Sequence, residues 1–410
     1  MSGEKGRKAR LNFVVKKQFI TGKAAVLFLG IAVLLSGCKT KEEEPDRKSE
    51  MSQWLESAEL SDTLTREELY SAALMEDTLV VYSVSSRAFE VKESFEKEYP
   101  GLTVDIKDIR GNDVVDMVRS DYESGENKCD IIICSDCDGS LYMNLIEPGL
   151  VYSYVPWDIA AHMKEGHSEG ELNFLGEVLM LFYNGEAFGE QPIENIWELT
   201  EEQYNGKIIM ASPLSSFSTY GFCATILGEE DAMQEAYEEY YDIPFTAADG
   251  KNAGELFWER VSPYIVYTNS SDEVMEGVGN SGSDGMLIGI MISSKMRYRE
   301  LGYHMTPIYR LEPFAAVYTP NSVMIAGGSK NINSAKLFVR YLLGESEGTG
   351  EGLKPFSTEG TWSTRTDVAD GNQIPLCEMN YVAMDKKFLY ENKKSLDAFF
   401  ERLLKENIGQ

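Results

Sequence analysis

Residues 176–184 read Gly-Glu-Val-Leu-Met-Leu-Phe-Tyr-Asn, in which 178–182 are apolar without a break. An uninterrupted apolar run of about five residues is typical of a strand that is buried on both faces. Such strands occur in sheets that are covered by helices on either side. The run therefore predicts a strand over 176–183 at the centre of an α/β fold.

Strands and helices alternate on both sides of this run. Upstream, strands are expected over 79–82, 103–109 and 130–134, and a helix over 88–99. Downstream, strands are expected over 207–211, 286–292 and 315–326, and helices over 219–227, 334–343 and 395–404. Thr65 and Glu68 fit a capping box that begins a short helix ahead of the first strand. This alternation predicts a mostly parallel sheet with helices on both faces.

The N-terminal segment has the order of an export signal. Seven Lys and Arg residues precede an apolar run over 24–35, which ends at Leu35-Ser36-Gly37-Cys38. These four residues resemble the lipobox of bacterial lipoproteins, whose cysteine is lipidated after cleavage just before it. A membrane-spanning helix is the alternative, but it needs about 20 apolar residues and this run has fewer. We therefore expect a signal peptide over 1–37, lipidation of Cys38 and an acidic, lipid-anchored tether over 38–63.

Charge and length narrow the classes of function. The formal net charge is −29, and the first 37 residues are basic, so the rest of the chain is more acidic still. A surface of this sign repels a phosphate backbone, which argues against nucleic acid as a partner. Because 410 residues exceed what one hydrophobic core usually serves, we expect two lobes.

Five cysteines remain apart from Cys38, and an odd number argues against a full disulfide framework in an exported protein. Cys134 and Cys137 form a Cys-x-x-Cys motif between an expected strand and an expected helix, as a thiol redox motif would. A thiol redox lipoprotein therefore stays open as an alternative, beside small buried cysteines. Since no second such motif and no His-x-x-x-His spacing accompanies it, we expect no metal and no other cofactor.

Four blocks of sequence together resemble bacterial extracellular solute-binding proteins of the ferric-ion, phosphonate and sugar-phosphate group. They lie at 68–83, 176–184, 192–213 and 334–343, and their order and spacing match from about Glu67 onward. The resemblance implies a type II periplasmic-binding-protein fold, with two α/β lobes, hinge strands and a ligand cleft between the lobes. It also implies the substrate-binding component of an ABC importer, without enzymatic activity.

The same resemblance implies how the chain is divided and with what it interacts. Lobe one would take 64–180, lobe two 181–312 and the return to lobe one 313–350, and a C-terminal helical segment over 351–410 would pack on the lobes. A monomer on the extracytoplasmic face of the cell membrane would deliver a small polar solute, anionic or phosphorylated, to a membrane permease. A second role, reporting ligand occupancy to a sensor kinase, stays open.

Hydroxyl-rich loops stand where a cleft of this kind collects ligand contacts. Free N–H groups and helix dipoles attract anions at strand-to-helix loops. Lobe one supplies Ser83, Ser85, Ser86 and Arg87, and lobe two supplies Ser215, Ser216, Ser218 and Thr219. Asp136 and Ser293 follow two further expected strands. The hydroxyls and Asp136 also suit helix caps, so both roles stay open.

The resemblance bears on ferric iron as well. Iron-binding members hold the metal largely through two neighbouring tyrosines. Counting back from Arg299-Glu300-Leu301-Gly302, which is similar to the helix that follows that pair, places it on Ile292 and Ser293. Neither side chain supplies a phenolate, so we expect a ligand other than Fe(III) and keep a ferric-ion-binding protein as the alternative.

Overall fold

The computed structural model describes residues 47–408, apart from 112, 247–249, 281, 283–284 and 346–348. The predicted signal peptide, Cys38 and the first part of the predicted tether lie outside the described residues. No helix within the described ranges is long and apolar enough to cross a membrane.

One sheet runs through the described chain, with the strand order β2-β1-β3-β10-β5-β8-β6-β7. These strands are β1 (Leu79–Ser83), β2 (Val104–Asp108), β3 (Ile131–Cys134), β5 (Asn173–Asn184), β6 (Ile208–Ala211), β7 (Ile265–Thr268), β8 (Ile288–Ile292) and β10 (Ala316–Ala326). The short strands β4 (Val151–Tyr152), β9 (Met305–Pro307), β11 (Trp362–Ser363) and β12 (Tyr381–Ala383) pair with β5 or β10. All seven expected strands are present, and β7 is additional to them.

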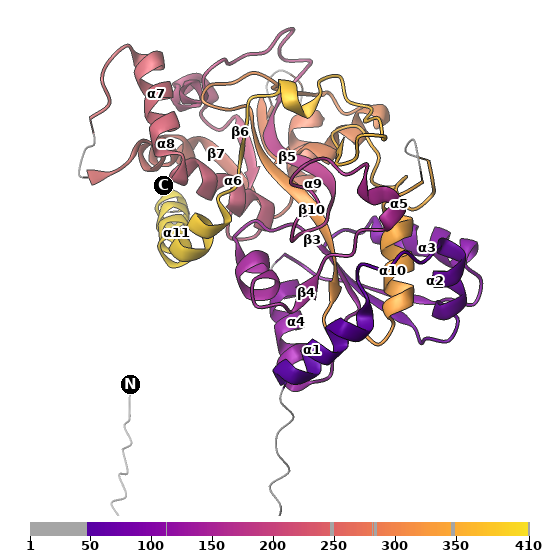
Figure 1. The fold of residues 1–410 in the computed structure, drawn as a ribbon. Coiled ribbons are helices and arrows are strands. Elements are labelled where there is room, and N and C mark those ends of the chain that lie inside the picture. Colours follow the sequence, from indigo (N-terminus) through magenta and orange to yellow (C-terminus); the bar gives the residue numbers. More distant parts are fainter. Residues whose placement is uncertain are drawn as a thin grey trace, which may run out of the picture. The chain divides into compact units, whose positions relative to one another are not determined.

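The outer strands are parallel, whereas the two central strands are not. β1 pairs in parallel with β2 and β3, and β6 does so with β7 and β8. β5 and β10 are antiparallel to each other and to their other neighbours in the main order, β8 and β3. The parallel prediction is therefore confirmed for the outer strands alone. The reason is that β5 carries the chain from one lobe to the other and β10 carries it back (Figure 1).

Two separate hydrophobic cores define the two lobes. On β5, Phe174 and Leu175 belong to the first core and 178–183 to the second. On β10, 323–326 belong to the first core, and Ala316 and Val317 to the second. Every residue of β5 is buried, as its apolar run predicts. The two-lobe α/β fold with crossing strands is therefore confirmed.

Helices cover the sheet in both lobes. Lobe one carries α2 (Arg66–Ala73), α3 (Ala88–Glu98), α4 (Asp113–Ser124), η1 (Tyr142–Ile146), α5 (Trp157–Ala160) and α10 (Ile332–Leu342). Lobe two carries η2 (Ile196–Thr200), η3 (Glu202–Tyr204), α6 (Phe217–Gly228), α7 (Glu230–Tyr241), α8 (Ala253–Val261), η5 (Ser262–Tyr264), α9 (Ser271–Gly279) and η6 (Ser293–Leu301). The capping box predicted for Thr65 and Glu68 begins α2.

The second half of the predicted tether contains a docked helix, α1 (Arg47–Ala58). Trp54 anchors this helix on lobe one. Its indole N–H donates to the carbonyl of Ser329 at 2.8 Å, and its ring centroid lies 5.5 Å from that of Tyr152. In the segment that follows the helix in sequence, the carboxylate of Asp62 pairs with the buried ammonium of Lys336.

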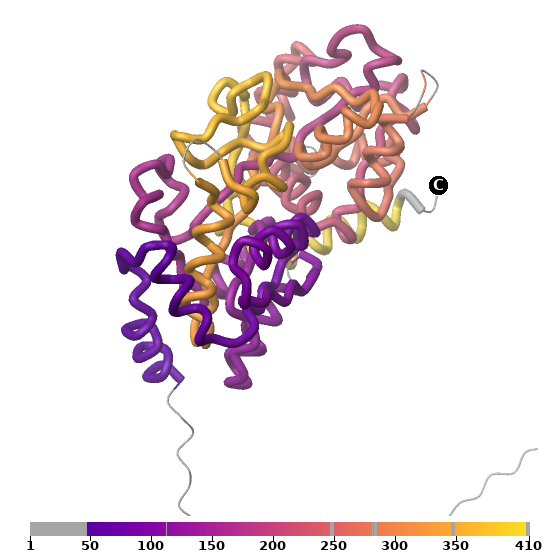
Figure 2. Tube along the Cα trace, turned by 90° about the vertical axis from the view of Figure 1, so that its right-hand side faces the viewer, coloured from indigo at the N-terminus to yellow at the C-terminus, as the bar shows by residue number. Residues whose placement is uncertain are grey.

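The C-terminal segment joins both lobes. Helix α11 (Lys386–Ile408), drawn in yellow in Figure 2, begins earlier than the expected range of 395–404, and the short helix η8 (Leu376–Glu378) precedes it. Its apolar residues Leu389, Leu396 and Phe400 belong to the core of lobe two. Its polar residues reach lobe one, where Lys386 pairs with Glu171 and the hydroxyl of Tyr390 donates to Asn144 at 2.7 Å.

Candidate ligand-binding site

A cavity of about 310 Å³ lies between the two lobes. The loop after β1 lines it from lobe one with 84–87, and the starts of α6 and η6 line it from lobe two. The crossing strands contribute Glu177 from β5 and Thr319 and Asn321 from β10. We call this space the central cavity. Its position, where loops of both lobes meet above the crossing strands, is the position of ligands in two-lobe α/β proteins.

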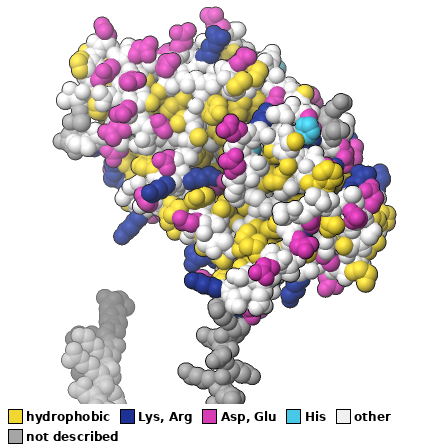
Figure 3. Space-filling model, in the orientation of Figure 1, with side chains coloured by type: hydrophobic (Ala, Val, Ile, Leu, Met, Phe, Trp, Pro, Cys, Tyr) yellow, Lys and Arg dark blue, Asp and Glu magenta, His cyan; other side chains and the backbone are white. Residues whose placement is uncertain are grey.

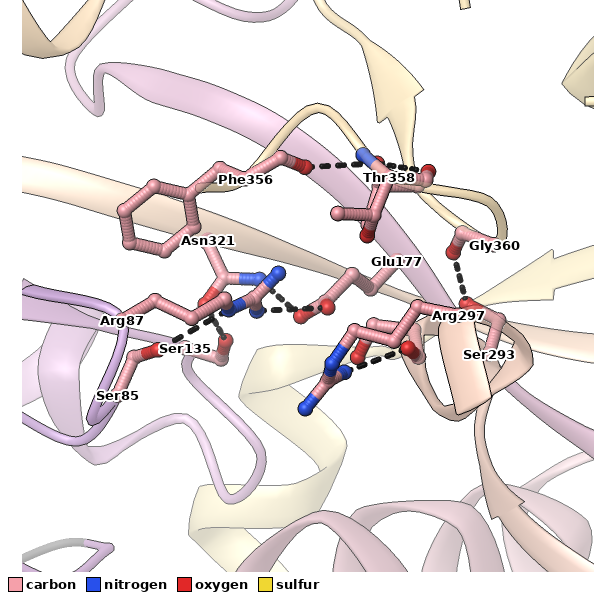
Figure 4. A network of polar contacts seen from close by, with 12 residues as sticks. Ser85, Arg87, Ser135, Glu177, Ser293, Arg297, Asn321, Phe356, Thr358 and Gly360 are labelled. Carbon is pink, nitrogen blue, oxygen red and sulfur yellow. Dashed lines mark hydrogen bonds and ion pairs between the residues drawn. The ribbon is translucent and has the colours of Figure 1, made fainter. Parts of the chain in front are cut away.

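An ion pair fixes Arg87 within the central cavity. Its guanidinium donates from Nη2 to Glu177 Oε1 at 2.9 Å and from Nε to Ser85 Oγ at 3.3 Å (Figure 4). The guanidinium carbon lies 4.5 Å from the centroid of the Phe356 ring, which covers it. The side chains of Arg87 and Glu177 are only 12% and 7% exposed. Arg87 is thus held in one orientation by contacts on three sides.

Glu177 is ionised in this setting. Burial acts to raise the pKa of its carboxyl group, but the charge of Arg87 and hydrogen bonds from Ser294, Asn321 and Arg87 outweigh it. The pKa of Glu177 therefore lies below its ordinary value. One guanidinium atom, Arg87 Nη1, is buried and has no hydrogen-bond partner among the described residues.

Two more cations come from η6 in lobe two. Lys295 pairs with Asp272 of α9, and Arg297 stacks on Tyr298, with its guanidinium carbon 4.5 Å from the ring centroid. The described lining of the central cavity therefore holds three basic side chains and one carboxylate. This local excess of positive charge contrasts with the chain as a whole, whose carboxylates spread over the face of lobe two seen in Figure 3.

Four of the predicted ligand residues line the central cavity together, namely Ser85, Ser86, Arg87 and Ser218. Ser83 is fully buried, and its hydroxyl donates to the carbonyl of Ser85 at 3.0 Å. Ser293 is also fully buried. Its hydroxyl donates to the carbonyl of Gly360 at 2.6 Å and accepts the N–H of Val178 at 3.0 Å.

The remaining predicted residues make caps or line a neighbouring cavity. Ser216 is the N-cap of α6 and accepts the N–H of Thr219 at 3.4 Å, while the buried Thr219 hydroxyl donates back to it at 2.9 Å. Ser215 and Ser216 line a second cavity beside the first. Asp136 is buried and accepts the N–H groups of Leu141 and Tyr142 at 3.3 and 3.0 Å. A ligand contact by any of these residues stays a prediction.

The prediction lacks Glu177, Asn321, Lys295 and Arg297, which line the central cavity. Glu177 carries a signal that could have found it, because a carboxylate inside a fully buried strand needs a cationic or hydrogen-bonding partner. Lys295 and Arg297 follow a buried strand directly, as residues at the edge of a cleft do. Asn321 carries no comparable signal.

The Cys-x-x-Cys motif is poorly suited to thiol redox chemistry. Cys134 and Cys137 are free and buried. Burial raises the pKa of both thiols, to about 12 for Cys137. Both therefore stay protonated at neutral pH, whereas redox cysteines react as thiolates.

Comparison with known proteins decides the family. The family described as Bacterial extracellular solute-binding protein matches residues 84–349. The chain belongs to this family. It is thus the substrate-binding component of an ABC importer, acts outside the cytoplasm on a small-molecule ligand and is a binding protein rather than an enzyme. No curated protein matches the chain.

Solved structures share the fold of this extracellular solute-binding protein at low sequence identity. Iron-bound HitA from Pseudomonas aeruginosa has a TM-score of 0.60 and 15% identity, over 80% of this chain and 99% of HitA. AfuA from Actinobacillus pleuropneumoniae, with fructose-6-phosphate bound, has a TM-score of 0.57 and 17% identity, over 78% of this chain and 96% of AfuA. The substrate-binding protein of an ABC transporter from Agrobacterium tumefaciens has a TM-score of 0.59 and 15% identity, over 80% and 94%.

Proposed function

We propose that this extracellular solute-binding protein holds a small anionic solute, bearing phosphate or carboxylate, in the central cavity and delivers it to the permease of its importer. The observation that supports the proposal is the local charge. The described residues that line the cavity include three basic side chains, Arg87, Lys295 and Arg297, and one carboxylate, Glu177, in a chain with a net charge of −29. Basic side chains that gather at one cavity, in a chain whose net charge is negative, are suited to an anionic ligand.

The contacts of Arg87 support this proposal. Glu177 and Ser85 occupy Nη2 and Nε, which leaves the buried Nη1 as a donor that the described residues do not use. A buried donor without a partner costs about 1–3 kcal/mol, and a ligand oxygen would recover that cost. The hydroxyls of Ser85, Ser86 and Ser218 are further donors at the same cavity.

The donor set suits an organic anion better than ferric iron, which is the alternative within the family. No tyrosine is among the described residues that line the central cavity. Its carboxylate, Glu177, is engaged by Arg87 and Asn321. Fe(III) is a hard cation and prefers phenolate and carboxylate oxygen, whereas guanidinium and ammonium groups repel it.

We also propose that the protein is a monomer held on the membrane by a lipid on Cys38. The support is the order of basic residues, apolar run and Leu35-Ser36-Gly37-Cys38 in the sequence.

A thermal-shift screen tests the ligand class. Because a ligand that binds only the folded state stabilises it by about 2.7 kcal/mol at a hundredfold excess over Kd, a bound class shows as a raised melting temperature. The panel holds inorganic phosphate, sugar phosphates, carboxylates, neutral sugars, polyamines and Fe(III). We expect phosphates or carboxylates to raise the melting temperature. Stabilisation by polyamines, neutral sugars or Fe(III) alone would refute the anionic class.

A further inference from the structure

A second cavity, of about 480 Å³, adjoins the central one. We call it the outer cavity. Lobe one lines it with Arg110 and Asp113, lobe two with Ser215 and Ser216, and α11 with Lys393 and Asp397. Two residues line both cavities, Gly111 from lobe one and Phe217 from lobe two. These two residues therefore stand at the boundary between the two spaces.

Gly111 and Phe217 meet across the cleft. A Cβ atom added to Gly111 would come within 3.1 Å of Phe217 Cβ, which is tighter than ordinary contact. Gly111 also has a φ of +46°, a conformation that glycine adopts most readily. The lack of a side chain at Gly111 is thus what lets the Phe217 side chain reach lobe one.

The position of Phe217 is fixed by its packing within lobe two. It is the first residue of α6, directly after the N-cap Ser216, and it packs against the core of lobe two. Its place is therefore set by the fold of lobe two, and its approach to Gly111 lies at the boundary between the two cavities.

We propose that Phe217 is a specificity-determining residue, which forms with Gly111 a wall that sets the maximum length of the ligand in the central cavity. The proposal rests on the proposed function, since it takes the central cavity as the ligand site. With the ring in place, the central cavity offers a ligand about 310 Å³. Without the ring, the ligand gains the adjoining 480 Å³.

The outer cavity suits a neutral extension of the ligand. It is lined by two basic side chains, Arg110 and Lys393, and three acidic ones, Asp113, Asp397 and Glu401. Lys393 is engaged, at 3.4 Å from Asp397 and 3.5 Å from Asp138. Carboxylates in excess disfavour a second anionic group, whereas the hydroxyls of Ser215 and Ser216 and the carboxylates can bond to ligand hydroxyls.

The experiment compares Phe217→Ala with the parent protein by titration calorimetry. The probes are glucose 6-phosphate and trehalose 6-phosphate, which place one phosphate on one or two sugar rings, together with glucose and trehalose. We expect the parent to prefer the one-ring phosphate by at least about tenfold. In Phe217→Ala, the affinity for the two-ring phosphate should rise at least about tenfold, while that for the one-ring phosphate changes less than about threefold.

Three further variants separate the wall from other effects. Phe217→Tyr keeps the ring and should keep the parent preference. Phe217→Leu is a smaller change and should show the same trend as Phe217→Ala if the latter folds poorly. Leu214→Ala removes an exposed apolar side chain from the outer cavity without opening the passage, and should leave the preference unchanged.

The outcomes distinguish this inference from the proposed function. If the phosphates bind and neither Phe217→Ala nor Phe217→Leu changes the length preference, the wall is refuted and the anionic class stands. If only the neutral sugars bind and their length preference changes, the wall stands and the anionic class is refuted. If no probe binds either protein, the wall, which is stated for ligands of this size, is refuted, and the thermal-shift panel with its carboxylates decides the anionic class.

Discussion

The guanidinium of Arg87, at the start of α3 in lobe one, lies 2.9 Å from the carboxylate of Glu177 on the crossing strand β5. The side-chain amide of Asn321, on the other crossing strand β10, donates to the same carboxylate. One carboxylate thus ties the loop after β1 in lobe one to both strands that cross between the lobes. The pair joins a loop that lines the central cavity and the crossing strands in one network.

Removing Arg87 alone should destabilise the fold more than removing the whole pair. Arg87→Met leaves the buried Glu177 carboxylate without its cation, which costs about 3–5 kcal/mol in buried pairs of this kind. Adding Glu177→Gln removes the unpaired charge and should recover much of that loss. Urea unfolding of the single and double variants measures both values. Equal losses in the two variants would show that the residues do not act as a pair.

The two cations of η6 should contribute to anion affinity. A charge-assisted hydrogen bond is worth about 1.5–3 kcal/mol, so Lys295→Gln or Arg297→Gln should weaken binding of the best anionic probe by at least about tenfold. Arg299→Gln is the matched control. It removes the same charge from the same helix, and like Lys295 it pairs with a carboxylate, that of Glu359 at 2.7 Å, but it is not among the residues described at the central cavity. An equal effect of Arg299→Gln would mean that net charge, and not contact, controls affinity.

Substitutions at Ser218 and Thr219 should separate a role in ligand binding from a role in capping helix α6. Ser218 lines the central cavity, so Ser218→Ala should lower affinity with little change in melting temperature. Thr219 is buried and bonded to the N-cap Ser216, so Thr219→Ala should cost about 1 kcal/mol of stability and leave affinity unchanged. Calorimetry measures the ligand affinity of both variants, and thermal unfolding measures their stability. If Ser218→Ala lost stability and Thr219→Ala lost affinity, Ser218 would be the capping hydroxyl and Thr219 the ligand contact.

The fold was predictable because its signals are local. The apolar run at 178–182 gives β5, and Thr65 with Glu68 gives the start of α2, since burial on both faces and capping each leave a pattern within a few residues. The start of α11 was harder to place. Its first turns place Lys386, Tyr390 and Lys393 against polar groups of lobe one, so the apolar periodicity that marks a helix begins later than the helix does.

The ligand site was predictable only in part, because it is assembled by tertiary structure. Ser85, Ser86 and Arg87 are adjacent in sequence, and a strand-to-helix loop is a recognised place for ligand contacts. Glu177 and Asn321 come from crossing strands that local patterns mark as buried, and no sequence spacing shows that they meet Arg87. Phe217 reads as an ordinary apolar residue until Gly111 is placed opposite it.

Lipid anchoring gives a prediction that depends on the N-terminal sequence alone. Cys38→Ser should give a protein without lipid, because Cys38 is the only cysteine in the export segment. Intact-mass measurement and membrane fractionation compare the variant with the parent, and Cys377→Ser, at an exposed cysteine, is the control. Lipid on the Cys38→Ser protein would overturn the assignment.

Asp136 makes stability depend on pH. Burial raises the pKa of its carboxyl group to about 6 from 3.8, against the opposing charge of Lys386 on α11 and the N–H of Tyr142. The neighbouring carboxylates Glu171 and Asp138 act in the same direction as burial. The folded state therefore holds this proton more tightly than the unfolded state does. Proton binding by Asp136 contributes fully to the free energy of unfolding below the pKa that this group has in the unfolded state. The contribution is lost as the pH rises through the pKa of the folded state.

We therefore expect the unfolding free energy of Asp136→Asn, relative to the parent, to rise between about pH 4 and pH 6. Asparagine has no charge to bury, but its one oxygen keeps only one of two bonds, because Asp136 accepts the N–H of Leu141 on Oδ1 and that of Tyr142 on Oδ2. The lost bond adds a cost that does not vary with pH. The gain in unfolding free energy should grow between about pH 4 and 6 and level off at up to roughly 3 kcal/mol. Urea unfolding across this pH range measures it, and in a Lys386→Met background the rise should extend to higher pH, because Lys386 lowers the folded-state pKa of Asp136. A gain that does not vary with pH would show that Asp136 does not change its protonation in this range.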